Sequence, residues 1–226
     1  MTKIIAELCQ NHNGDVKILE EMVHSASESG ADYAKIQSML SKNLTHRKRF
    51  DEGLIEGGEI RVKNRPYKAE YERLSKLDLN DEQHHIFIDY CKKYKIKPMT
   101  TIFDRSRLEF LESLNFETIK VSSFDCASHK MIEEISNSKI KEVIVSTGCA
   151  YDHEIKKTSQ LLKNKDFTLM HCISLYPTPL SEVHLDRIEY LRGFSKNVGL
   201  SEHSNSDLDG LKISISSLMY DVKYIE

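Results

Sequence analysis

Charged and hydroxylated side chains recur within or directly after short apolar runs of this sequence. Glu7 lies in "KIIAEL", Lys35 and Gln37 lie in "YAKIQ", and Lys120 lies in "TIKVSS". A single buried charge is usually paired for structural reasons, but several charges that converge on one place are costly to bury without a ligand. The repetition therefore predicts a shared polar site.

The residue types indicate what such a site would bind. Ammonium groups and hydroxyl donors suit a small molecule that carries phosphate and carboxylate groups. The candidate residues are Lys35, Thr101, Lys120, Ser123, Ser146 and Ser201. His203 could ligate a divalent metal, although a lone histidine is more often a hydrogen-bonding side chain. A phosphorylated small acid is the expected ligand.

Alternating strands and helices would have to position these side chains. Eight β-rich runs cover residues 3–8, 33–37, 97–103, 118–123, 142–147, 168–173, 197–203 and 222–226. Amphipathic segments lie between them, and Asn80 with Gln83 has the spacing of a capping box. Leu208, Leu211, Ile215 and Leu218 form an apolar helical stripe before the last run.

Eight β-α units predict an α/β fold, a (β/α)8 TIM barrel with parallel strands and right-handed crossovers. A doubly wound open sheet is the alternative, but "NHNGD" after the first run lacks the G-x-G-x-x-G pattern. In a barrel the carboxyl ends of the strands face one mouth. We expect one domain over residues 1–226, with a long loop at 38–79 that could cover the mouth. Its basic "HRKR" at 46–49 is interpreted as a solvated loop face without a function.

The composition excludes several classes of protein. The chain has 226 residues, 39% hydrophobic and 30% charged, and a net charge of −3, which argues against disorder and against nucleic-acid binding. No apolar run is long enough for a membrane span, and the N-terminus lacks the apolar region of a secretion signal. Five cysteines without a C-x-x-C pair fit reduced thiols and a cytoplasmic location.

The blocks "AELCQNHNGD", "YAKIQ", "TIKVSS", "IVSTG", "HCISLYPTP" and "VGLSEH" resemble, in order and spacing, the sialic acid synthase family of N-acetylneuraminate synthase type. The resemblance covers essentially the whole chain. It implies a transferase of sialic acid biosynthesis that condenses phosphoenolpyruvate with an N-acetylated hexose such as N-acetylmannosamine and releases phosphate. It also implies a TIM barrel and a divalent metal of the Mn²⁺, Mg²⁺ or Co²⁺ type.

Residue by residue, the resemblance assigns the following roles. It implies catalytic carboxylates at Glu7 and Asp125 and a metal ligand at His203. It implies sugar contacts from Gln37, Asp125 and Tyr176. Phosphoenolpyruvate would be held by Lys35, Thr101, Lys120, Ser123, Ser146 and Ser201.

The departures from the family leave alternatives open. Ile102 stands in place of a proline, and Glu202 in place of an aspartate. After "VKYIE" the family continues with a second metal histidine, a closing helix and a small antifreeze-like domain that reaches a partner subunit, so we expect a truncated barrel, and a homodimer is allowed. An inactive truncated barrel or binding module with a phosphoenolpyruvate pocket is the alternative function. A metal-dependent hydrolase would need more clustered ligands. The acceptor stays open among N-acetylmannosamine, its phosphate and diacetamido sugars.

Overall fold

The computed structural model describes residues 1–226 and contains a closed barrel of eight parallel strands. The strand order around the barrel is β1-β10-β9-β8-β7-β6-β5-β2. The predicted TIM barrel is therefore confirmed. The barrel strands are β1 (Lys3–Cys9), β2 (Tyr33–Ser38), β5 (Lys97–Ile102), β6 (Thr118–Val121), β7 (Glu142–Ser146), β8 (Asp166–His171), β9 (Asn197–Leu200) and β10 (Tyr224–Ile225).

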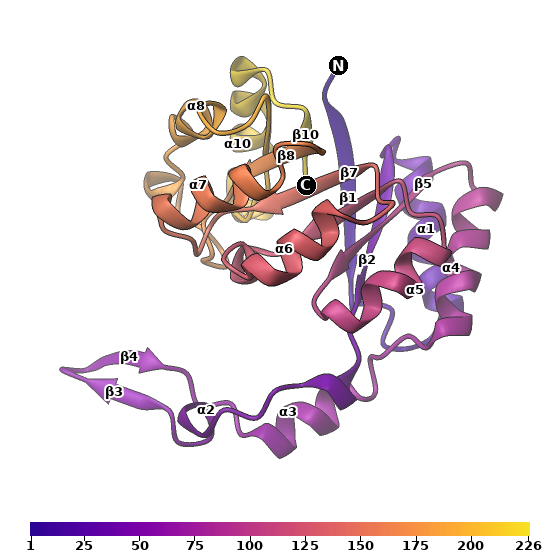
Figure 1. The fold of residues 1–226 in the computed structure, drawn as a ribbon, viewed down its shortest axis with the longest axis horizontal. Helices are drawn as coiled ribbons and strands as arrows, with labels where there is room; N and C mark the ends of the chain where they lie inside the picture. The colour runs from indigo at the N-terminus through magenta and orange to yellow at the C-terminus, as the bar shows by residue number, and fades with distance from the viewer.

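Helices connect successive strands and cover the outside of the barrel (Figure 1). Outward residues such as Ala34, Ile36 and Val143 pack with helix residues such as Leu19 and Phe87 into the main hydrophobic core. The covering helices are α1 (Val16–Glu28), α4 (Asp81–Lys93), α5 (Leu108–Ser113), α6 (His129–Ser136), α7 (Asp152–Leu161) and α8 (Arg187–Arg192). Two further short helices, α9 (Ser206–Asp209) and α10 (Lys212–Ser217), precede β10. None of the helices is long and apolar enough to pass through a bilayer.

Local capping signals fix where the helices begin. Asp15 caps α1 by accepting a hydrogen bond from the Lys17 N–H, as its position before the apolar stripe predicts. The predicted capping box of Asn80 and Gln83 is also present at the start of α4. These caps satisfy N–H groups that have no partner inside the helix.

The inside of the barrel holds a second, separate apolar layer. It consists of Ile5, Tyr33, Met99, Ile144, Met170 and Tyr224, one from each of six strands, and all six are buried. Because strand side chains alternate between faces, the residue two positions further along each strand also points inward, nearer the carboxyl end. This apolar layer, called the apolar floor below, closes the barrel beneath the polar residues near the carboxyl ends of the strands.

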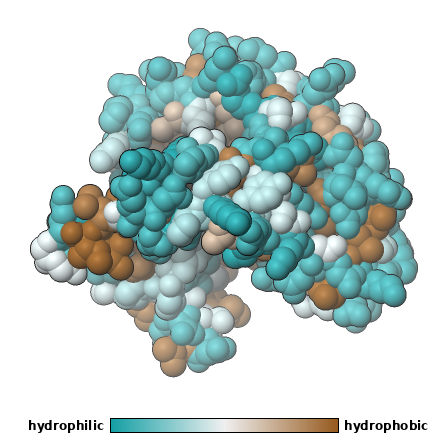
Figure 2. All heavy atoms as spheres, turned by 90° about the horizontal axis from the view of Figure 1, so that it is seen from below, coloured by the Kyte–Doolittle hydropathy of each residue, from teal (hydrophilic) through white to brown (hydrophobic).

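The connection between β2 and α4, residues 39–80, forms an excursion with secondary structure of its own. It contains α2 (Lys48–Glu52), the hairpin of β3 (Leu54–Glu56) and β4 (Glu59–Val62), and α3 (Tyr67–Leu74). In Figure 1 β1 runs from the top toward the bottom, and the excursion lies below the barrel, at the carboxyl ends of the strands. Viewed from that side in Figure 2, brown atoms gather at the left, where the hairpin projects with exposed Leu54, Ile55 and Ile60.

The stripe before the last strand differs from the sequence expectation. Gly210, with φ +61°, divides it into two short helices, and Leu208, Leu211, Ile215 and Leu218 are all exposed instead of packing on the barrel. Positive φ suits glycine because it lacks a Cβ. The expected single amphipathic helix is therefore wrong in both continuity and burial.

Candidate active site

A cavity of about 520 Å³ opens at the carboxyl end of the barrel. This volume is in the range of small-molecule sites, roughly 300–1,000 Å³. Six of its lining residues stand two positions after a member of the apolar floor: Glu7, Lys35, Thr101, Ser146, Cys172 and Glu226. Because residues two positions apart in a strand lie on the same face, these polar side chains form a layer directly above the apolar one.

Lys35 lies at the centre of the polar layer and is 1% exposed. Its ammonium group contacts the Glu7 carboxylate, donates to the Thr101 hydroxyl at 2.9 Å and lies 3.1 Å from Glu226 Oε1. Burial lowers the pKa of Lys35 to about 8, although Glu226 acts in the opposite direction. This lysine therefore loses its charge at a much lower pH than an exposed lysine does.

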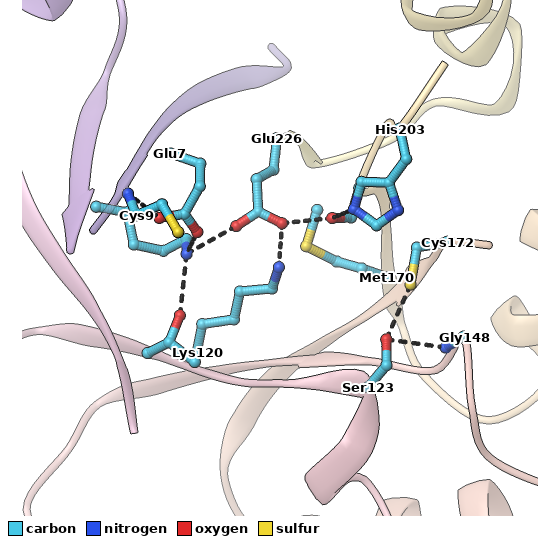
Figure 3. A network of polar contacts seen from close by, with 12 residues as sticks. Glu7, Cys9, Lys120, Ser123, Gly148, Met170, Cys172, His203 and Glu226 are labelled. Atoms are coloured by element: carbon cyan, nitrogen blue, oxygen red, sulfur yellow. Dashed lines mark hydrogen bonds and ion pairs between the residues drawn. The ribbon is translucent and has the colours of Figure 1, made fainter. Parts of the chain in front are cut away.

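Glu226 joins the two lysines of the site. Its carboxylate contacts the Lys120 ammonium, lies near Lys35 and accepts a hydrogen bond from Ser201 Oγ at 2.5 Å. Burial alone would raise the pKa of Glu226, but the charges of Lys120 and Lys35 outweigh burial and hold that pKa well below its usual range. Figure 3 shows this carboxylate in the middle of the network, with Glu7 on one side and His203 on the other.

A second group of donors lies across the cavity, at the ends of β6 and β7. The Gly148 N–H donates to Ser123 Oγ at 3.1 Å, and Ser123 Oγ lies 2.9 Å from Cys172 Sγ (Figure 3). A Cβ on Gly148 would stand 2.7 Å from that sulfur, so the close approach requires glycine. Ser146 Oγ is buried and has no hydrogen-bond partner. A buried hydroxyl without a partner indicates a position for a polar ligand atom.

His203 is held in one orientation at the edge of the cavity. Its Nδ1 lies 2.7 Å from the Ile173 carbonyl and so carries the proton, which leaves the Nε2 lone pair 3.5 Å from Ser201 Oγ. A metal-ligating histidine typically donates the N–H of its other ring nitrogen to a backbone carbonyl in this way. Residues 1–226 contain no group of three or more histidine, cysteine or acidic side chains placed to hold a metal. The residues present therefore fit one metal ligand and not a whole site.

The predicted sugar-site residues divide into two groups. Gln37 and Tyr176 line the cavity, and the Tyr176 ring packs 4.2 Å from the His203 ring. Asp125 does not line the cavity. Its buried carboxylate instead accepts hydrogen bonds from the Ser122 and Ser128 hydroxyls. Burial raises the pKa of Asp125 although these hydroxyls oppose the shift.

All the other predicted site residues line the one cavity: Glu7, Lys35, Thr101, Lys120, Ser123, Ser146, Ser201 and His203. Glu226 also lines the cavity and was not among the predicted site residues, although it ends the eighth β-rich run and the rule for polar strand ends applies to it as well. Phe124, which stands between two predicted residues, lines the cavity and is 67% exposed, was not predicted either. No signal in the sequence separated Phe124 from an ordinary loop residue.

The sequence matches a known protein family over most of its length. The sequence model of the NeuB family matches residues 22–226, which is most of the chain. The chain belongs to the NeuB family. This confirms the family resemblance that the sequence motifs predict.

Named NeuB-type synthases are among the relatives. The chain is 30% identical over 239 residues to the N,N'-diacetyllegionaminic acid synthase of Campylobacter jejuni, and it covers 66% of that protein. It is 27% identical to the N-acetylneuraminate-9-phosphate synthase of Drosophila melanogaster and covers 58% of it. The chain thus spans somewhat less than two thirds of the length of such relatives.

Among solved structures, the N-acetylneuraminic acid synthetase of Leptospira borgpetersenii, in complex with citrate, superposes with a TM-score of 0.83 at 25% identity. The match covers all of this chain and 72% of that protein. A putative spore coat polysaccharide biosynthesis protein E of Chromobacterium violaceum matches with a TM-score of 0.82 at 27% identity, over all of this chain and 65% of that one. The NeuB-family barrel is therefore the fold of the whole chain.

Proposed function

We propose that this chain is the catalytic barrel of an enzyme that condenses phosphoenolpyruvate with an N-acetylated hexose to give a sialic acid-type nonulosonic acid and phosphate. The observation that carries the proposal is the polar layer of the cavity, in which Lys35, Lys120 and the Ser146 hydroxyl, which has no hydrogen-bond partner, lie above a closed apolar layer. Membership of the NeuB family supports the same reaction.

In the proposed reaction, C3 of phosphoenolpyruvate forms a bond to the aldehyde carbon of the open-chain sugar, and the aldehyde oxygen takes up a proton. Water adds at C2 and loses a proton. The C2–O bond to phosphate then breaks, the C2 hydroxyl loses its proton, and the product is an α-keto acid. Atoms balance as phosphoenolpyruvate, sugar and water to product and phosphate.

The chain's own residues supply binding and proton transfer. Lys35 and Lys120 would pair with the phosphate and carboxylate groups, and the hydroxyls of Ser123 and Ser146 would donate to the remaining oxygens. Glu7 is the proposed proton-transfer group because its carboxylate faces the cavity and is oriented by the Cys9 N–H at 2.6 Å. Asp125 would take part only if its side chain turned toward the cavity.

His203 is the one residue proposed here to ligate a divalent metal. Bound beside that imidazole, the metal would supply Lewis-acid polarisation of the aldehyde. Residues 1–226 offer no further clustered ligands that would hold the ion.

A phosphate-release assay tests the proposed function. The chain is incubated with phosphoenolpyruvate, Mn²⁺ and N-acetylmannosamine, and with the acceptor omitted as a control. Acceptor-dependent phosphate release together with a nonulosonic acid in the product mixture is the expected result. Acceptor-independent release, or a different carbon skeleton, would contradict the proposal.

A binding module that retains the phosphoenolpyruvate pocket is the second candidate, because the lysines and hydroxyls that would hold phosphoenolpyruvate line the cavity whether or not a metal is bound. In that case phosphoenolpyruvate binds to the lysine layer but no acceptor causes phosphate release. Calorimetric titration with phosphoenolpyruvate separates this outcome from a chain without a pocket.

A further inference from the structure

One side chain connects the excursion to the rim of the cavity. The guanidinium carbon of Arg47, directly before α2, lies 5.5 Å from the centroid of the Phe124 ring. Phe124 lines the cavity, and its ring is mostly exposed. Arg47 also acts on the Asp125 carboxyl just behind, where its charge opposes the rise in pKa that burial causes. The "HRKR" cluster thus places one of its cations at the mouth of the site.

The backbone that carries Arg47 is anchored by its neighbours. His46 Nε2 lies 2.5 Å from an Asp51 carboxylate oxygen, and the His46 ring packs 5.0 Å from the Tyr67 ring. The other Asp51 oxygen accepts a hydrogen bond from the Tyr67 N–H at 2.7 Å. These contacts tie α2 and the residue before Arg47 to the start of α3. At the base of the excursion, Asp78 accepts hydrogen bonds from the N–H and hydroxyl of Ser41.

Arg47 is free to bind an anion. Several other cations of the excursion are paired, as Arg61 is with Glu59 and Arg73 with Glu70, whereas the Arg47 side chain forms no ion pair within 4 Å and no hydrogen bond. Residues 39–80 hold ten lysines and arginines against seven acidic residues, although the whole chain has an excess of acids. The cavity mouth therefore faces a locally cationic segment with unused guanidinium donors.

From this geometry, and resting on the proposed function, we propose that Arg47 and Phe124 select a phosphorylated N-acetylated hexose as the acceptor. The lysine layer at the bottom holds phosphoenolpyruvate, so the acceptor occupies the outer part, against the Phe124 ring. A phosphate ester at the far end of that sugar would accept two hydrogen bonds from the Arg47 guanidinium, because the planar guanidinium can donate two parallel hydrogen bonds to one phosphate. A neutral acceptor would leave Arg47 without an ionic partner. The relatives include synthases named for both kinds of product, so sequence identity alone does not decide between the acceptors.

The test compares N-acetylmannosamine with its 6-phosphate on the wild-type chain, Arg47→Gln and Arg49→Gln. Arg49 is the matched control because it is an unpaired arginine of the same cluster whose guanidinium lies 5.0 Å from Phe50 instead of over the rim. Calorimetric affinity in the presence of phosphoenolpyruvate is measured alongside kcat/KM. Wild type is expected to favour the phosphorylated sugar, and Arg47→Gln to reduce this preference about tenfold, the loss of one charge-assisted contact. Arg49→Gln should change it less than about twofold.

Two outcomes would overturn the inference: a wild-type preference for the neutral sugar, or an equal loss in Arg47→Gln and Arg49→Gln. Failure of the proposed function is separate, because it appears as a lack of acceptor-dependent phosphate release with either sugar. In that case the binding preference alone still decides the role of Arg47. Raising the ionic strength should weaken binding of the phosphorylated sugar only.

Discussion

Lys35 is buried between the carboxylates of Glu7 and Glu226, in the layer proposed to bind phosphoenolpyruvate. Burial lowers the pKa of Lys35 to about 8. An anionic ligand binds the protonated, ammonium form of Lys35. Well below pH 8 Lys35 is already protonated, so binding takes up no proton, whereas well above pH 8 Lys35 must take up a proton when the ligand binds. The affinity for phosphoenolpyruvate should therefore be flat from pH 7 to 8 and then fall, approaching about tenfold per pH unit.

Calorimetry at pH 7, 8, 9 and 9.5 measures this dependence. In Lys35→Met, which keeps a chain of similar length without the charge, affinity should be lower at pH 7 and nearly constant with pH. A profile in that variant with the same decline as wild type would assign the titration to another group.

Glu7 is the second residue with a testable role. Glu7→Gln keeps the shape of the side chain but removes the group that moves a proton, so turnover should fall about 10²–10⁴-fold while phosphoenolpyruvate binding persists. Phosphate release and calorimetric binding are measured on the same preparation. Turnover within about threefold of wild type would remove Glu7 from the chemistry.

At the scale of elements, α4 is the helix whose start is best defined. Asn80 and Gln83 exchange hydrogen bonds at 2.9 and 2.8 Å across its first turn. Asn80→Ala should lower the free energy of unfolding by about 1 kcal/mol because N–H groups of the first turn lose their acceptor. Urea unfolding checks this value.

Lys92→Ala, on an exposed part of the last turn of α4, is the matched control, since its contact with Asp89 is largely exposed. It should change the free energy of unfolding by less than about 0.5 kcal/mol. Equal losses in the two variants would mean that the cap is not what stabilises the helix.

At the scale of the whole molecule, apolar surface is concentrated outside the barrel in two places. Leu211 and Ile215 on α10 are 65% and 61% exposed, and Ile55 and Ile60 on the hairpin are 70% and 66% exposed. Exposed apolar patches favour association. Since the α10 patch continues through Leu208 and Leu218, the double change Leu211→Ser, Ile215→Ser should reduce self-association more than Ile55→Ser, Ile60→Ser.

Analytical ultracentrifugation over a range of concentrations measures that effect. Neither double variant should lower the free energy of unfolding by more than about 1 kcal/mol, because the side chains are already in water. A stronger effect of the hairpin variant would assign the association to the excursion.

Much of the barrel is determined by local features of the sequence. Apolar runs separated by amphipathic segments define the eight strands, and Asp15, Asn80 and Gln83 define helix starts through contacts within a few residues. The polar strand ends likewise predicted a shared cavity, because the period of two and parallel pairing bring strand ends together wherever a barrel closes.

Contacts between distant parts of the chain required the tertiary structure. Glu226 lies 106 residues from Lys120, and their pairing depends on the closure of β10 against β1. The position of Arg47 over Phe124 depends on the path of a 42-residue excursion. Sequence pattern specifies which face of an element is apolar, whereas the partner of a polar side chain depends on the packing of elements far apart in the chain.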